Sequence, residues 1–122
     1  MWKNKSTVVI GASPNADRYS FKATVSLQNH KHTVYPIGIK KGTINGLEII
    51  NNKPELLDID TVTLYIGPVN QPQWYDYILS LKPKRIIFNP GTENSELIAI
   101  AQRNEIETEI ACTLVLLSIN HY

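Results

Sequence analysis

The chain of 122 residues has one cysteine and a formal net charge of +1, which excludes an internal disulfide framework and a cysteine-rich zinc site and gives no overall field that would attract nucleic acid or a membrane surface. Hydrophobic residues make up 43% and charged residues 19%, the proportions of a globular protein, and the length predicts one domain over residues 1–122. No stretch approaches the ~20 apolar residues of a membrane span, and the first apolar run is too short for a signal peptide. We therefore expect a cytoplasmic protein.

The first half of the chain alternates strand-like runs with helical spacing. The opening run is apolar and β-branched and stops at Gly11, which is typical of a buried strand with a sharp exit. Phe21 and Val25 recur at helical spacing, and Pro54 suits the first position of a helical turn. The predicted order is a strand at 6–10, a helix ending at Asn29, a strand at 33–37, an irregular segment at 38–53 with a short strand pair, and one helical turn at 54–57.

The second half continues the alternation. Trp74, Ile78 and Leu81 recur at i, i+4 and i+7, and Pro83 ends that helix. Thr92 or Asn94 can cap the next helix. The predicted order is a strand at 61–66, a helix starting near Pro72, a strand at 85–88, a helix after Asn94, a strand at 106–110 and a final helix within 112–119.

Short apolar strands that alternate with helices indicate an α/β fold whose sheet is buried on both faces. We therefore expect a Rossmann-like three-layer fold, with a five-stranded parallel sheet and helices on both faces. In such sheets, ligands bind beyond the carboxyl ends of the strands. The residues that end the predicted strands are therefore site candidates: Gly11, Ala12 and Ser13, then Tyr35, Pro36 and Ile37, then Gly67, Pro68 and Val69, and finally Asn89 and Gly91.

The first of these turns has the properties of a phosphate-accepting loop. Gly11 lets the backbone turn tightly, and the following helix begins with unpaired amide groups that suit an anion. Arg18 and Lys22 lie just downstream and are candidates to reach a diphosphate. Residues 1–61 carry eight lysines and arginines against five acidic residues, which suggests that this half faces an anionic ligand.

The loop differs from a dinucleotide fingerprint. The second and third glycines of G-x-G-x-x-G are absent after Gly11, and so is the Walker A pattern. No acidic residue ends the second strand to hold a ribose diol. Lys40 and Lys41 follow instead, and lysines there suit a ribose that bears a phosphate, as in coenzyme A or NADP.

The order of these motifs resembles the small stand-alone CoA-binding domain proteins and the CoA-binding domain of succinyl-CoA synthetase. The resemblance covers nearly the whole chain. It rests on five segments: Val8-Val9-Ile10-Gly11-Ala12-Ser13, Val34-Tyr35-Pro36-Ile37 with Gly46 downstream, Ile66-Gly67-Pro68, Phe88-Asn89-Pro90-Gly91-Thr92-Glu93-Asn94, and the strand that leads into Cys112. The family commonly has Val-Asn-Pro where this chain has Ile37-Gly38-Ile39. The resemblance implies that coenzyme A places its diphosphate at Gly11–Ser13 and its adenosine near residues 35–41 and 67–69.

We interpret the chain as a non-catalytic binder of coenzyme A or an acyl-CoA. His30 and His32 flank the start of the second strand, opposite the expected site, and no metal-ligand spacing is evident. Two alternatives stay open. One is an NADP-linked enzyme, or a thiol-active enzyme using Cys112, in the same crevice. The other is an interaction domain with a vestigial pocket. A protein partner or a homodimer is possible, whereas nucleic acid and membrane are not expected.

Overall fold

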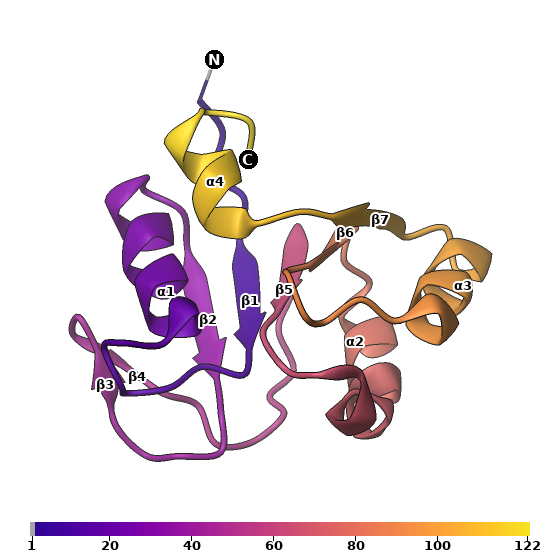
Figure 1. Ribbon diagram of the computed structural model, residues 1–122, viewed down its shortest axis with the longest axis horizontal. Helices are drawn as coiled ribbons and strands as arrows, with labels where there is room; N and C mark the ends of the chain where they lie inside the picture. The colour runs from indigo at the N-terminus through magenta and orange to yellow at the C-terminus, as the bar shows by residue number, and fades with distance from the viewer. Residues whose placement is uncertain (1) are drawn as a thin grey trace.

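A five-stranded parallel sheet forms the centre of the molecule, as a computed structural model that describes residues 2–122 shows (Figure 1). The strand order is β2-β1-β5-β6-β7, so β1 lies between β2 and β5. Its register aligns the last residues of three neighbouring strands, because Ile10 pairs with Ile37 and with Leu64. The strands are β1 Thr7–Ile10, β2 Val34–Ile37, β5 Thr61–Leu64, β6 Arg85–Phe88 and β7 Glu107–Ile110.

Four helices cover the two faces of this sheet. Leu27 and Leu117 belong to one buried cluster, which places α1 and α4 on one face. Ile78 and Leu97 belong to the other cluster, which places α2 and α3 on the opposite face. The helices are α1 Tyr19–Asn29, α2 Tyr75–Leu81, α3 Ser95–Arg103 and α4 Thr113–Ser118. The predicted Rossmann-like three-layer fold is confirmed.

Shorter elements fill the connections. An antiparallel pair, β3 Thr43–Ile44 and β4 Leu47–Glu48, lies beside α1 within the segment expected to be irregular (Figure 1). Two single turns of 3-10 helix, η1 Pro68–Asn70 and η2 Pro72–Trp74, precede α2. None of the helices in residues 2–122 has both the length and the apolar character needed to cross a membrane.

The prediction of a helical turn at residues 54–57 is wrong. The segment is irregular there, and the Pro54 carbonyl accepts a hydrogen bond from the Tyr77 hydroxyl at 2.7 Å. Leu56 packs against the core of the α2 and α3 face. Tertiary contacts therefore outweigh the local preference that proline has for a helix start. The strand expected at 61–66 ends at Leu64, so Tyr65 and Ile66 belong to the loop beyond the sheet.

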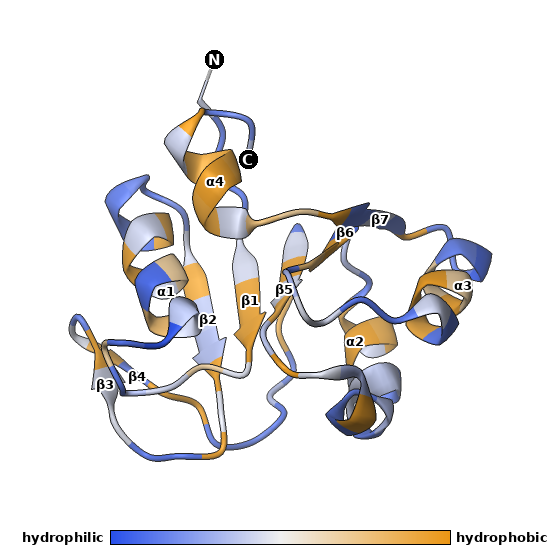
Figure 2. Cartoon of the chain, viewed as in Figure 1, coloured by the Kyte–Doolittle hydropathy of each residue, from blue (hydrophilic) through white to orange (hydrophobic). Residues whose placement is uncertain are grey.

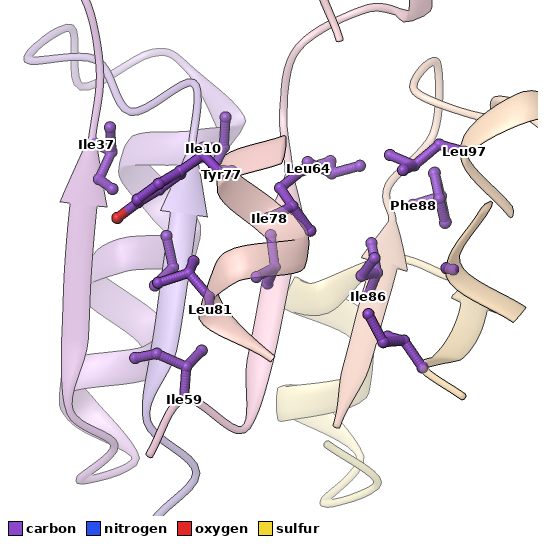
Figure 3. Close-up of a cluster of buried hydrophobic side chains, with 14 residues drawn as sticks. Ile10, Ile37, Ile59, Leu64, Tyr77, Ile78, Leu81, Ile86, Phe88 and Leu97 are labelled. Carbon is purple, nitrogen blue, oxygen red and sulfur yellow. The ribbon is translucent and has the colours of Figure 1, made fainter. Parts of the chain in front are cut away.

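The three central strands lie within the core, although β5 carries Thr61 and Thr63 and β6 begins with Arg85. Residues of β1, β5 and β6 are buried throughout, and Figure 2 shows β1 and β6 as hydrophobic while the edge strand β7 is hydrophilic. Figure 3 shows Ile78 of α2 beside Leu64 of the sheet and Leu81 nearer to Ile59, all within one buried cluster. The glutamates of β7 suit an edge strand, because charged side chains disfavour pairing with another chain.

Asn94 caps α3, and its removal is expected to destabilise the protein. Its Oδ1 atom accepts hydrogen bonds from the Glu96 and Leu97 amides at 3.1 and 3.3 Å. Because these amides have no partner within the helix, Asn94→Ala should lower the free energy of unfolding by about 1–2 kcal/mol. Urea unfolding followed by circular dichroism measures this loss. Asn94→Ser keeps an acceptor and should recover part of it, and equal losses for both variants would contradict a capping role.

Candidate binding cleft at the carboxyl ends of the strands

A cleft of about 580 Å³ lies where the loops after β1, β2, β5 and β6 meet. The loop after β1 contributes Gly11, Ala12 and Ser13, and the loop after β2 contributes Gly38 and Lys40. These are the strand ends at which ligands bind in open parallel sheets. The volume falls within the range of ordinary small-molecule sites.

The loop after β1 is held by backbone bonds and by the absence of side chains at two glycines. The amides of Gly11 and Ala12 both donate to the Ile37 carbonyl, at 3.0 and 2.9 Å. Gly11 has a φ of +99°, and a Cβ atom there would lie 2.9 Å from the backbone of Tyr65. A Cβ atom on Gly38 would lie 2.1 Å from the Ala12 carbonyl oxygen. The loop therefore keeps its shape only while both positions lack a side chain.

The chain then turns into α1 through a short network of side chain to backbone bonds. The Asn15 amide donates to Ser13 Oγ at 3.1 Å, and the Asp17 amide donates to Asn15 Oδ1 at 2.9 Å. Arg18 occupies the N-cap position of α1, and no side chain caps the helix. Tyr19 and Ser20, the first helical residues, line the cleft. The first amides of α1 and its partial positive charge are thus available to an anion.

The electrostatics of the cleft favour a negative ligand. Arg18 and Lys40 are the charged residues among those that line it, and both are cations. The Nζ atom of Lys22 lies 5.3 Å from the centre of the Tyr19 ring at the same end. Because both cations line the cleft together with the N-terminus of α1, a phosphate group there would meet positive charge from the side chains and from the helix.

The wall opposite these cations is neutral and rigid. Gln71 is fully buried, and its Nε2 atom donates to the Ile66 and Thr92 carbonyls at 3.0 and 2.7 Å. Its Oε1 atom accepts from Asn94 Nδ2 at 2.8 Å. This side chain joins the loops after β5 and β6. The wall it supports contributes Asn70, Gln73, Trp74, Pro90 and Thr92 to the cleft.

The predicted site residues fall into two groups. Gly11, Ala12, Ser13, Arg18 and Lys40 line the cleft. The others lie outside its lining, for identifiable reasons. Tyr35, Pro36 and Ile37 form β2, Lys22 and Lys41 lie exposed beside the cleft, Gly67, Pro68, Val69 and Gly91 are exposed in turns, and Asn89 is buried.

Asn89 serves as an internal clamp in this structure. Its Nδ2 atom donates to Thr63 Oγ1 at 2.6 Å and to the Leu64 carbonyl at 2.8 Å, and its Oδ1 atom accepts from the Thr113 amide at 2.9 Å. Its backbone carbonyl accepts from both the amide and the hydroxyl of Thr92. The side chain is therefore committed to joining β5, β6 and α4.

Sequence reasoning missed the residues that follow β5. Tyr65 and Ile66 fall within the range predicted as a strand. Asn70, Gln73 and Trp74 lie beyond Val69, the last candidate residue predicted in this loop. A proline pair at 68 and 72, framing amide side chains, was the available signal. Burial, reinforced by the neighbouring Cys112, raises the pKa of Tyr65.

The histidines and Cys112 are not among the residues that line the cleft. His30 and His32 line a separate hollow with Lys5 and Tyr122 at the amino ends of the strands. Cys112 is half-buried at the start of α4 and is not among the lining residues. Within residues 2–122, no group of three histidine, cysteine or acidic residues is arranged to hold a metal ion.

The strand order and the glycine loop after β1 define the class of protein: a Rossmann-like α/β domain with a cleft at the carboxyl ends of its strands. Within that class the chain belongs to the CoA binding domain family, whose model matches residues 5–118. No curated protein matches the chain significantly.

Solved structures share this fold. The crystal structure of an uncharacterized protein is 52% identical, with a TM-score of 0.96 over 98% of this chain and 99% of that chain. The protein called cell-free ID.343 from Thermus thermophilus is 17% identical, with a TM-score of 0.82 over 98% and 91% of the two chains. A hypothetical protein from Pyrococcus horikoshii OT3 is 24% identical, with a TM-score of 0.79 over 93% and 81%. At these lower identities the likeness concerns the fold alone.

Proposed function

We propose that this protein binds coenzyme A, free or acylated, in the cleft at the carboxyl ends of its strands and does no chemistry on it. The observation that carries the proposal is the pairing of the tightly turned loop at Gly11–Ser13 with two cations, Arg18 and Lys40, in one cleft. The diphosphate lies against this loop and the first turn of α1, within reach of Arg18. Membership of the CoA binding domain family supports the same ligand.

The composition of the lining supports binding without catalysis. The residues that line the cleft include no histidine, cysteine, aspartate or glutamate. General acid–base catalysis at neutral pH relies chiefly on such groups. The role that follows is that of a sensor, carrier or subunit, acting in the cytoplasm.

Calorimetric titration with coenzyme A, dephospho-CoA, NADPH and ATP tests the proposal. Coenzyme A should bind more tightly than the other three. Tighter binding of NADPH would favour an NADP-linked enzyme, and turnover lost in Cys112→Ala would favour a thiol-active one. If none of the four ligands gives heat or a thermal shift, the proposal fails, and an interaction domain with a vestigial pocket is then the better interpretation.

Lys40 is expected to recognise the 3′-phosphate of the ligand. Lys40→Met should weaken coenzyme A binding about ten-fold, the effect of losing one hydrogen bond to a charged group. Dephospho-CoA lacks the 3′-phosphate, so its affinity should be the same for the wild type and for Lys40→Met. Titration of both proteins with both ligands checks this expectation. Equal weakening of the two ligands would instead assign Lys40 to the diphosphate.

A further inference from the structure

The charged residues of the cleft lie on one side of it only. An elongated ligand with one charged and one uncharged end therefore has a preferred orientation in the cleft. Its charged lining residues, Arg18 and Lys40, come from the loops after β1 and β2. The loops after β5 and β6 contribute neutral groups, among them the amides of Asn70 and Gln73 and the indole of Trp74. If the phosphates of coenzyme A lie at the cations and its adenosine lies beside residues 35–41, its uncharged arm, which contains two amides and ends in the thiol, extends toward Trp74.

Trp74 is fixed by contacts on several sides. The Lys53 ammonium lies 4.7 Å from the centre of the indole ring and donates to the Gln73 carbonyl at 2.7 Å. The Tyr77 ring meets the indole edge-on at 6.0 Å, and Tyr77 is itself buried. The Trp74 amide donates to the carbonyl of Gln71, the buried clamp of this wall, at 2.8 Å. An aromatic side chain held by an ammonium group, a second ring and its own backbone forms a rigid wall.

We infer that Trp74 sets the size of the acyl group that the cleft accepts, so that free coenzyme A or a short acyl-CoA is selected over a longer one. This inference rests on the proposed function. The indole lines the neutral side of the cleft, toward which the arm extends in that orientation, and its contacts with Lys53 and Tyr77 oppose its turning aside for a longer chain. Lys53 acts as a positioning residue, because it holds the indole.

Titration of the wild type and of Trp74→Ala with coenzyme A, acetyl-CoA and octanoyl-CoA tests this. The wild type should bind octanoyl-CoA at least ten-fold more weakly than acetyl-CoA. Trp74→Ala should bind octanoyl-CoA at least as tightly as acetyl-CoA, since each methylene newly buried gains about four-fold in affinity. If Trp74→Ala does not fold, Trp74→Leu takes its place in the experiment. It keeps an apolar side chain against the core and should show the same change to a smaller degree.

Two further variants separate selection from general damage. Trp2→Ala removes the other tryptophan, which is exposed and lines the hollow at the opposite end of the sheet, and it should leave the ratio of octanoyl-CoA to acetyl-CoA affinity unchanged. Lys53→Met should relax that ratio partly, by about three-fold, while unfolding stability stays close to that of the wild type.

The outcomes distinguish this inference from the proposed function. If coenzyme A binds but the wild type shows no preference for the short acyl group, or if the variants at Trp74 keep the wild-type ratio, the role of Trp74 is overturned and coenzyme A binding stands. If the wild type binds no form of coenzyme A, the proposed function fails and the inference fails with it.

Discussion

Gly38→Ala is expected to weaken coenzyme A binding by ten-fold to a hundred-fold and to lower the free energy of unfolding by about 1–3 kcal/mol. The added methyl carbon would lie 2.1 Å from the Ala12 carbonyl oxygen. The loop that contains Ala12 and the end of β2 would have to separate by roughly 1 Å to reach an ordinary contact distance. Since the Ala12 amide donates to the neighbouring Ile37 carbonyl, that movement distorts the phosphate-accepting loop itself.

Calorimetry for binding and urea unfolding for stability check this expectation. Gly67→Ala is the matched stability control, because a Cβ atom there meets nothing within 4 Å and its φ of −69° suits alanine. Gly67→Ala should therefore unfold at the urea concentration of the wild type. If Gly38→Ala kept wild-type affinity, the Gly11–Ser13 loop would not be the part of the cleft that holds the ligand.

Asn89→Ala is expected to lower the free energy of unfolding of the ligand-free protein by about 2–5 kcal/mol. The substitution leaves the Leu64 carbonyl and the Thr113 amide without their partner, and unsatisfied buried polar groups cost about 1–3 kcal/mol each. Asn89 is 1% exposed, so water cannot replace the lost bonds without opening the core. The result would identify this side chain as a clamp between β5, β6 and α4.

Urea unfolding in the absence of ligand gives the direct measurement. Asn52→Ala, at an exposed asparagine, is the control and should change stability by less than about 0.5 kcal/mol. A residue that contacted only the ligand would behave in the opposite way: Asn89→Ala would then keep the stability of the free protein and lose affinity for coenzyme A. That result would identify Asn89 as a ligand-binding residue, as the sequence predicts.

The fold was predictable because its signals are local. Apolar runs mark the buried strands β1 and β6, helical spacing marks α2, and Asn94 precedes α3 as a cap. Each signal acts within a few residues and is repeated in every unit of the alternation. Where local preference conflicted with packing, as at Pro54, the sequence prediction failed, because the Tyr77 hydroxyl and the core hold that segment in another conformation.

Five of the residues that line the cleft were predictable: Gly11, Ala12, Ser13, Arg18 and Lys40. Gly11 at the end of an apolar run predicts a sharp turn, and this turn lines the cleft. The other strand ends look alike in the sequence, each with a glycine or a proline, although one of them carries a buried clamp at Asn89 and another leads to an exposed turn at Val69. Nothing local distinguishes a side chain that points into a cleft from one that points into the core.

The sequence by itself therefore determined the parallel α/β architecture, the glycine turn after the first strand and the family to which the chain belongs. The tertiary structure alone decided that Gly38 touches Ala12, that Asn89 faces inward and that Trp74 lines the cleft. These contacts join segments that are distant along the chain. They depend on the order and register of the strands, which place β1 between β2 and β5, and local periodicity and turn chemistry carry no information about that order.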